Sequence, residues 1–287
     1  RDFQAKIGQF VALTLLDRMD EAGEVAGGMG ESPNPFERLI GAYLTVAMYT
    51  IQGRADDAIT RADEAARIDG ISADQRFAAR SFQASMLGAI GKPELALAIL
   101  EREQAGMTGS PGEFGAVAAL TIAEARAGRT AEAHATLARL DELVTSAPQP
   151  ARKRAADFAR GVVARADGDT ALAIDALTRV ARGLRPRGPV TGPTEHVGVW
   201  YEIAETSIAA GRDSDAVEWL ERIVDVGHER VFNSMAYVRA HFLLAEIYDG
   251  RGDAARARSL YERFVAYWGD SAMDRERVAT ARRKLAQ

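Results

Sequence analysis

The chain has 287 residues, of which 47% are apolar and 27% are charged, within the range of a folded globular protein. Its formal net charge of −5 argues against general nucleic-acid binding, which needs a basic surface to displace phosphate counterions. The absence of cysteine excludes disulfides, thiol nucleophiles and zinc–thiolate sites. No apolar run approaches the roughly 18–20 residues of a membrane span, so we expect no membrane segment in this chain.

A short turn recurs along the chain, as QGRADDA, IGKPELA, AGRTAEA, DGDTALA, AGRDSDA and RGDAARA. An alanine follows each of its glycines after five residues, and the turn returns every 37 to 43 residues. Self-similarity at such a period indicates a helical repeat array. The glycines are Gly53, Gly91, Gly128, Gly168, Gly211 and Gly252.

Each position of this turn has a structural reason. The glycine can end one helix in the left-handed conformation, and Thr130, Asp213 and Asp253 offer oxygens that could cap the next helix. An earlier copy, LDRMDEAGEVA, has Asp17 in place of the glycine. We therefore predict seven helix pairs over residues 1–268, around turns at 17, 53, 91, 128, 168, 211 and 252, and a single capping helix over 271–287.

Two short segments in the first part of the chain contain glycines that could suggest phosphate binding. GGMG, at residues 27–30, lacks the preceding strand and the following Lys-Ser/Thr of a phosphate-binding loop. Gly91-Lys92 is followed by proline rather than by serine or threonine. We interpret both segments as linkers.

The longest insertion, GLRPRGPVTGPTEH, covers residues 183–196 and lies among Arg182, Arg185 and Arg187. It is either a flexible crossover or an arm that binds an anion or a partner, since long loops are often functional. Beyond it, the last turn is followed by Tyr261, Phe264 and Trp268 at helical spacing. We expect these aromatics to pack against the preceding helix and the capping helix.

The titratable residues do not form a recognisable catalytic set. None of the histidines (His134, His196, His228 and His241) are paired at i, i+4, the spacing of a helical zinc site. Glu202 and Glu205 are spaced i, i+3, which is common on any solvated helix. Without a nucleophile, base and orienting group together, we expect no enzymatic activity, no metal and no other cofactor.

The turn pattern resembles the tetratricopeptide repeat over residues 1 to about 268, most clearly in VWYEIAETSIAAGRDSDAVEWLERIV and YVRAHFLLAEIYDGRGDAARARSLYERFV. The sequence departs from this family in its period, which exceeds about 34 residues, and in lacking most of the repeat-ending prolines. The resemblance implies an all-α, right-handed α-solenoid. The last segment, with its basic helix, is also similar to the C-terminal repeats of certain bacterial serine/threonine kinases and related regulators.

In this family the first helix of each pair lines a concave groove that binds segments of partner proteins. The family's clamp of lysine and asparagine for a terminal carboxylate is not expected here, because no groove position carries lysine. Tyr201 and Phe242 could instead pack against neighbouring helices. The candidate groove residues that the resemblance implies are Tyr43, Ser81, Ser85, Phe158, Arg165, Tyr201, Glu205, Arg239, Phe242 and Glu246.

Three functions are compatible with these observations. The favoured hypothesis is a non-catalytic protein-interaction or sensory module of a larger bacterial signalling protein in the cytoplasm, binding a protein or peptide partner. A receptor domain for a small ligand or peptide in a transcriptional regulator is the first alternative, and a self-association module that forms a homo-oligomer is the second. Because the chain begins at Arg1, we expect a longer or processed protein, in which an upstream targeting signal is left open.

Overall fold

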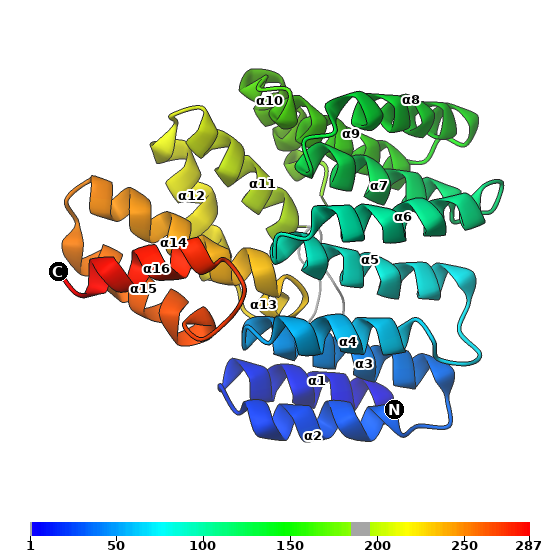
Figure 1. The fold of residues 1–287 in the computed structure, drawn as a ribbon, viewed down its shortest axis with the longest axis horizontal. Coiled ribbons are helices and arrows are strands. Elements are labelled where there is room, and N and C mark those ends of the chain that lie inside the picture. The colour runs from blue at the N-terminus through cyan, green and yellow to red at the C-terminus, as the bar shows by residue number, and fades with distance from the viewer. Residues whose placement is uncertain (1, 185–195) are drawn as a thin grey trace. The chain divides into compact units, whose positions relative to one another are not determined.

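The computed structural model describes residues 2–184 and 196–287, which form sixteen helices and no strand (Figure 1). The predicted all-α solenoid of seven helix pairs with a final single helix is confirmed in these residues. A short helix, α13, was not predicted. The pairs are α1 (Asp2–Leu15) and α2 (Met19–Gly30), α3 (Pro35–Ile51) and α4 (Ala55–Ala65), α5 (Ala73–Ala89) and α6 (Pro93–Met107), α7 (Glu113–Arg126) and α8 (Thr130–Ser146), α9 (Pro150–Ala166) and α10 (Thr170–Arg182), α11 (His196–Ala209) and α12 (Asp213–Val224), and α14 (Ser234–Gly250) and α15 (Ala254–Trp268), with α13 (Glu229–Phe232) before the last pair and α16 (Arg275–Leu285) after it.

The turn inside each pair has a left-handed residue at its centre. All six turn glycines have φ between +69° and +83°, and Asp17 has φ +56°, a region that glycine enters without strain and aspartate tolerates. The residue after the glycine is the N-cap, as in Asp253, whose side chain accepts a hydrogen bond from the Arg256 N–H. The predicted caps at Thr130 and Asp213 are wrong by one residue, because they are the first residues of α8 and α12. The N-cap of α8, Arg129, makes no side-chain capping bond.

The interpretation of GGMG as a linker is also wrong, because residues 27–30 form the last turn of α2. This turn is helical because Ala26 and Met29 are fully buried in it. The close approach of α3 depends on Gly41, where a Cβ would lie 2.8 Å from the carbonyl oxygen of Ala26. Packing against the next helix outweighs the low helix propensity of the glycines.

The described residues divide into two compact units. Unit 1 contains α1 to α4, the start of α11 up to Tyr201, the end of α12 from Val217, and α13 to α16. Unit 2 contains α5 to α10 with the remaining parts of α11 and α12. Both units therefore include segments that are far apart in the sequence.

Unit 1 joins the first helix pairs of the chain to the last pair. The indole Nε1 of Trp268 donates a hydrogen bond to the carbonyl oxygen of Thr50 at 2.9 Å, and the Ser271 hydroxyl donates to that of Gly53. Arg230 donates to the carbonyl oxygen of Thr14 at 2.9 Å. These bonds connect the ends of α1 and α3 to segments more than 200 residues away in the sequence.

The aromatic residues of α15 pack as expected against the preceding helix. Tyr261 and Phe264 contact Phe242 of α14, with ring centroids 5.9 and 5.1 Å apart. Trp268 is fully buried and reaches the end of α3 through its bond to Thr50. The contact with α3 was not predicted.

Unit 2 has its core between successive pairs, where α7, α8 and α9 contribute Val117, Leu140 and Val162 to one buried cluster. Small residues allow the two helices of a pair to approach. At Gly161 of α9, a Cβ would lie 2.7 Å from Cγ of Leu177 in α10. These contacts fix the spacing of the first helices α5, α7 and α9.

Candidate functional site

The candidate groove residues are distributed over both units, always on the first helix of a pair. Ser81 and Ser85 lie on α5, Phe158 and Arg165 on α9, and Glu205 on the part of α11 in unit 2. Tyr43 lies on α3, Tyr201 on the start of α11, and Arg239, Phe242 and Glu246 on α14, all in unit 1.

In unit 2, ion pairs connect three consecutive first helices. Glu202 of α11 pairs with Arg126 of α7 and with Arg165 of α9, where Nη2 lies 2.9 Å from Oε2 of Glu202. Arg165 also donates to Oε2 of Glu205 at 3.2 Å. The Glu202 side chain is 3% exposed, whereas that of Arg126 is 50% exposed. A buried carboxylate thus holds guanidinium groups that reach the surface.

The ionisation of Glu202 follows from these neighbours. Burial on its own would raise the pKa of Glu202, but the charges of Arg126 and Arg165 and their hydrogen bonds hold it below its usual value. The carboxylate is therefore ionised at neutral pH. Because it fixes both arginines at once, it orders this part of the surface before any ligand arrives.

Arg126 and Glu202 were not among the predicted groove residues. Glu202 was dismissed because carboxylates at i, i+3 are common on helices. A weak signal was present, since Arg126 lies two residues before Gly128 and Arg165 lies three residues before Gly168, both in the last turn of a first helix. In a repeat array, the last turns of successive first helices belong to neighbouring repeats.

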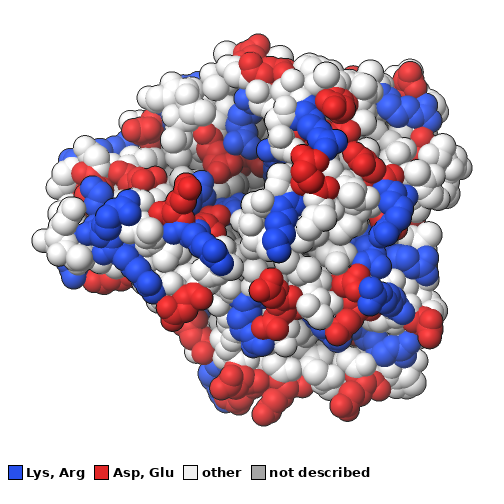
Figure 2. Space-filling model, in the orientation of Figure 1, with Lys and Arg blue, Asp and Glu red and all other residues white. Residues whose placement is uncertain are grey.

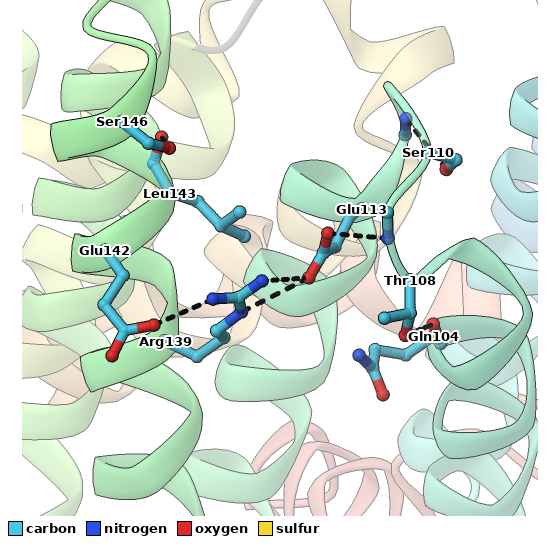
Figure 3. A network of polar contacts seen from close by, with 10 residues as sticks. Gln104, Thr108, Ser110, Glu113, Arg139, Glu142, Leu143 and Ser146 are labelled. Carbon is cyan, nitrogen blue, oxygen red and sulfur yellow. Dashed lines mark hydrogen bonds and ion pairs between the residues drawn. The ribbon is translucent and has the colours of Figure 1, made fainter.

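A second network fixes the start of α7, the helix that carries Arg126 (Figure 3). The buried Glu113 accepts the Gly109 N–H at 2.9 Å and two bonds from Arg139 of α8, at 3.2 and 2.7 Å. Arg139 also donates to Glu142 at 2.8 Å. The hydrogen bonds from the Arg139 side chain, followed by the bond from the Gly109 N–H, hold the pKa of Glu113 below its usual value. The loop before α7 is thereby pinned to both helices of the pair.

The other candidate residues of unit 2, on α5 and α9, are uncharged. Ser85 is exposed, and Ser81 and Phe158 are half-buried. At Gly88, one turn beyond Ser85, a Cβ would have no atom within 4 Å. A bound segment could therefore approach the backbone of α5 closely at this position.

In unit 1, the candidate residues of α14 are joined to α16. Arg239 makes two hydrogen bonds to Asp274, of 2.8 and 2.7 Å, and Arg277 lies 3.2 Å from the same carboxylate. Phe242 is buried below the guanidinium of Arg277, whereas Glu246 is exposed. Arg239 and Glu246 are thus the members of this group that offer polar atoms at the surface.

The tyrosines among the candidates are mostly enclosed. Tyr201 is 7% exposed. Tyr43 is half-buried, and burial raises the pKa of its hydroxyl to about 12. Both rings therefore contribute more to packing in unit 1 than to an accessible surface.

Several other expectations concern groups or segments outside these clusters. No group of three His, Asp or Glu side chains that could hold a metal is found in residues 2–184 and 196–287. None of the helices in this part of the chain is long and apolar enough to cross a membrane. Residues 185–195, including Arg185 and Arg187, lie outside the described residues, so the proposed arm stays a prediction.

Comparisons with known proteins identify the repeat. Residues 239–271 match the sequence model of the tetratricopeptide repeat. A comparison with curated protein sequences gave no match. Among solved structures, the chain is similar to NprR in complex with its cognate peptide NprX, with a TM-score of 0.57 and 15% identity over 91% of this chain and 76% of that one.

Two further structures are similar over most of this chain. A Rap protein complexed with competence and sporulation factor has a TM-score of 0.51 and 13% identity, over 99% of this chain and 98% of that one. A signal transduction ATPase with numerous domains and a tetratricopeptide repeat sensor, from Pyrococcus horikoshii, has a TM-score of 0.57 and 11% identity, over 93% and 43%. At these identities the likeness concerns the fold.

Proposed function

We propose that this chain, which has the fold of tetratricopeptide-repeat proteins, is a non-catalytic module that binds a segment of another protein. The binding surface in this proposal is formed by the first helices of unit 2. Two proteins of similar fold, NprR and a Rap protein, are described in complex with a peptide or a peptide factor, which supports a ligand of the same class here.

The observation that carries the proposal is the arginine–carboxylate network of α7, α9 and α11. Arg126 is half-exposed but anchored by the buried Glu202, and Arg165 is held between Glu202 and Glu205. A guanidinium that is already ordered loses little side-chain entropy on binding. Phe158 lies on the same helix as Arg165, two turns before it, and is half-buried, so a segment with an apolar group next to a polar group would match both residues.

A peptide selection can test this proposal. A peptide library displayed on phage is selected on the protein, and the affinity of the enriched peptides is measured by fluorescence anisotropy. Replacement of Arg126 or Arg165 by alanine should weaken binding at least tenfold. The matched control is Arg179→Ala, which removes a half-exposed, ion-paired arginine from the second helix α10. The proposed surface would be contradicted if Arg179→Ala weakened peptide binding equally, or if neither Arg126→Ala nor Arg165→Ala weakened it.

We infer further that the module serves a larger regulatory protein in the cytoplasm. In the ATPase from Pyrococcus horikoshii a tetratricopeptide repeat sensor is part of a chain of which the match covers 43%. That arrangement supports a sensory role for the same fold here. The sequence that flanks this chain in its gene would test the inference, since a catalytic or DNA-binding domain is expected there.

A receptor for a small molecule is a second candidate, supported by a cavity in unit 1. The cavity has a volume of about 340 Å³ and lies between the end of α3 and α15, within the size range of ligand pockets. Thermal-shift screening with a metabolite library would test it, with Tyr267→Ala as the variant expected to lose the shift. The lining residues are Asp17, Met19, Ile51, Gln52, Arg263, Ala266 and Tyr267.

A further inference from the structure

The exposed side of α2 is acidic and has no cover in the described residues. Asp20, Glu24, Gly27 and Glu31 follow one another at spacings of four, three and four residues and therefore lie on one side of the helix. All four are exposed, as are Glu21 and Gly28 beside them, and Glu21 is paired with Arg18 at 2.5 Å. We call these six residues the acidic face. Figure 2 shows the acidic side chains gathered over α2, at the bottom of the view.

The two glycines of the acidic face have no explanation within the chain. Gly41 must be glycine because its neighbours leave no room for a Cβ, whereas a Cβ at Gly27 or Gly28 would have no atom within 4 Å. Neither has a positive φ. Glycine inside a helix costs stability relative to alanine, so two exposed glycines indicate that this side of α2 is approached closely by something outside the described residues.

The exposed side of α16 is mostly basic, with the exposed Glu276 as its acidic member. Arg275, Ala279 and Arg282 follow at spacings of four and three residues, with Arg283 and Lys284 beside them, and all five are exposed. We call these residues the basic face. Arg282 forms an ion pair of 3.0 Å with Asp270, and Lys284 forms one of 2.6 Å with Asp249. Neither aspartate belongs to the basic face. Figure 2 shows basic side chains over α16, on the left of the view.

We propose that the acidic face of one copy binds the basic face of a second copy, with α2 and α16 antiparallel. In that orientation, setting Gly27 against Ala279 also sets Glu24 opposite Arg282 and Glu31 opposite Arg275. The small residues at the centre allow the two helix backbones to come close, and the charges lie on either side. The acidic first turn of α2 also meets the basic last turn of α16. Because the helices are antiparallel, the positive end of each helix dipole lies beside the negative end of the other, which is favourable.

A second copy of the same chain carries the surface that fits the acidic face. The two faces match in charge and in the spacing of their small residues, and both belong to unit 1 of the same molecule. The contact joins two different surfaces, so it produces either a two-fold dimer, in which both contacts form at once, or a longer head-to-tail assembly. Electrostatic matching of this kind contributes specificity and a strong dependence on salt.

Sedimentation velocity over a concentration series tests the proposal. Association is expected in about 0.1 M salt and should weaken at least tenfold in about 1 M salt, where the Debye length falls from about 10 Å to about 3 Å. Glu24→Arg and Arg282→Glu should each leave a monomer. An equimolar mixture of these two variants should associate again, because the introduced arginine of one variant then faces the introduced glutamate of the other, and the remaining contact keeps the original pair.

Two further variants separate the contact from folding and from general charge effects. Gly27→Leu should remain folded, since a Cβ at this exposed position would have no atom within 4 Å, but should abolish association. Glu218→Arg changes an exposed glutamate of α12 and should associate like the wild type. A monomer at every concentration in low salt would overturn the proposal. So would association that persists in Glu24→Arg or Gly27→Leu, or a mixture of the two charge variants that stays monomeric.

Discussion

At the scale of single residues, the main feature is a carboxylate surrounded by protein. Glu202 has almost no exposure and depends on Arg126 and Arg165 for its ionisation. Breaking a buried pair from one side leaves charges without their partner. Because both arginines reach solvent, water can hydrate them in part, and the cost is smaller than for a fully buried triad.

Glu202→Gln should therefore destabilise the protein by about 2 kcal/mol, measured by urea unfolding at neutral pH. The folded pKa of Glu202 lies below its unfolded value, so its contribution is present above the usual glutamate pKa and is lost as the pH falls through the folded value. The difference between wild type and variant should shrink accordingly in acid. The matched Glu218→Gln, at an exposed i, i+4 pair, should change stability by less than about 0.5 kcal/mol.

His241 of α14 is a buried base that stays neutral, whereas the buried Glu202 stays charged. Its Nδ1 donates to the carbonyl oxygen of Tyr237 at 2.9 Å, and the rings of Tyr237 and Tyr267 pack against it. Burial, followed by the charges of Arg263 and Arg230, lowers the pKa of His241 from 6.5 to about 4. Between these two values the unfolded chain binds a proton that the folded chain does not.

Stability should therefore fall as the pH is lowered from 6.5 to about 4, with His241 contributing about 3 kcal/mol of the loss. His241→Asn should flatten this part of the pH profile even if it lowers stability at pH 7. Urea unfolding at half-unit pH intervals measures both slopes. Identical slopes for the two proteins would show that another group is responsible.

At the scale of elements, the sequence predicts the pairs well because each turn carries several agreeing signals. A left-handed residue, a capping position and an alanine at the helix crossing recur together, so a helix boundary is marked more than once. The exceptions have local causes. GGMG was interpreted as a linker after the comparison with a phosphate-binding loop failed, but the burial of Met29 and the contact with Gly41 make it helical. The four-residue α13 is too short to leave a periodic pattern.

The glycines of α2 and α3 allow a matched test of propensity against packing. Gly27→Ala should raise the free energy of unfolding by about 0.5–1 kcal/mol, because its Cβ meets nothing. Gly41→Ala should lower it, because its Cβ would lie 2.8 Å from the Ala26 oxygen and 2.9 Å from Cβ of Met29. Thermal unfolding of both variants and of the wild type measures whether each substitution raises or lowers the stability. The same sign for both would contradict the close approach of α2 and α3.

At the scale of the whole molecule, unit 1 departs from a simple series of neighbours. In an open repeat array each pair contacts only the next one, but here α13 and α14 contact α3, and Trp268 of α15 bonds to its end. The periodicity of α15 predicts that Trp268 faces inward, yet it contains no information about which segment covers it. The periodicity of α7 and α11 likewise contains no information about the ion pair between Arg126 and Glu202, 76 positions apart.

Trp268→Ala should therefore weaken helices far from the substitution in sequence. Removing a fully buried tryptophan costs about 3–5 kcal/mol, and hydrogen exchange should show faster exchange in α3 as well as in α15. Leu177→Ala, at a fully buried position of α10 in unit 2, is the control and should leave α3 protected. If the tryptophan variant lost protection only in α14–α16, α3 would not depend on its contact with α15.

The bonds from Trp268, Ser271 and Arg230 to the ends of α1 and α3 have a consequence for biosynthesis. A ribosome adds about 5–20 residues per second, so about 10–40 seconds separate the emergence of α3 from that of α15. During this interval the first pairs lack the segment that covers them, and their apolar surface is available to chaperones. The beginning of the chain thus completes its folding only after α15 has been made.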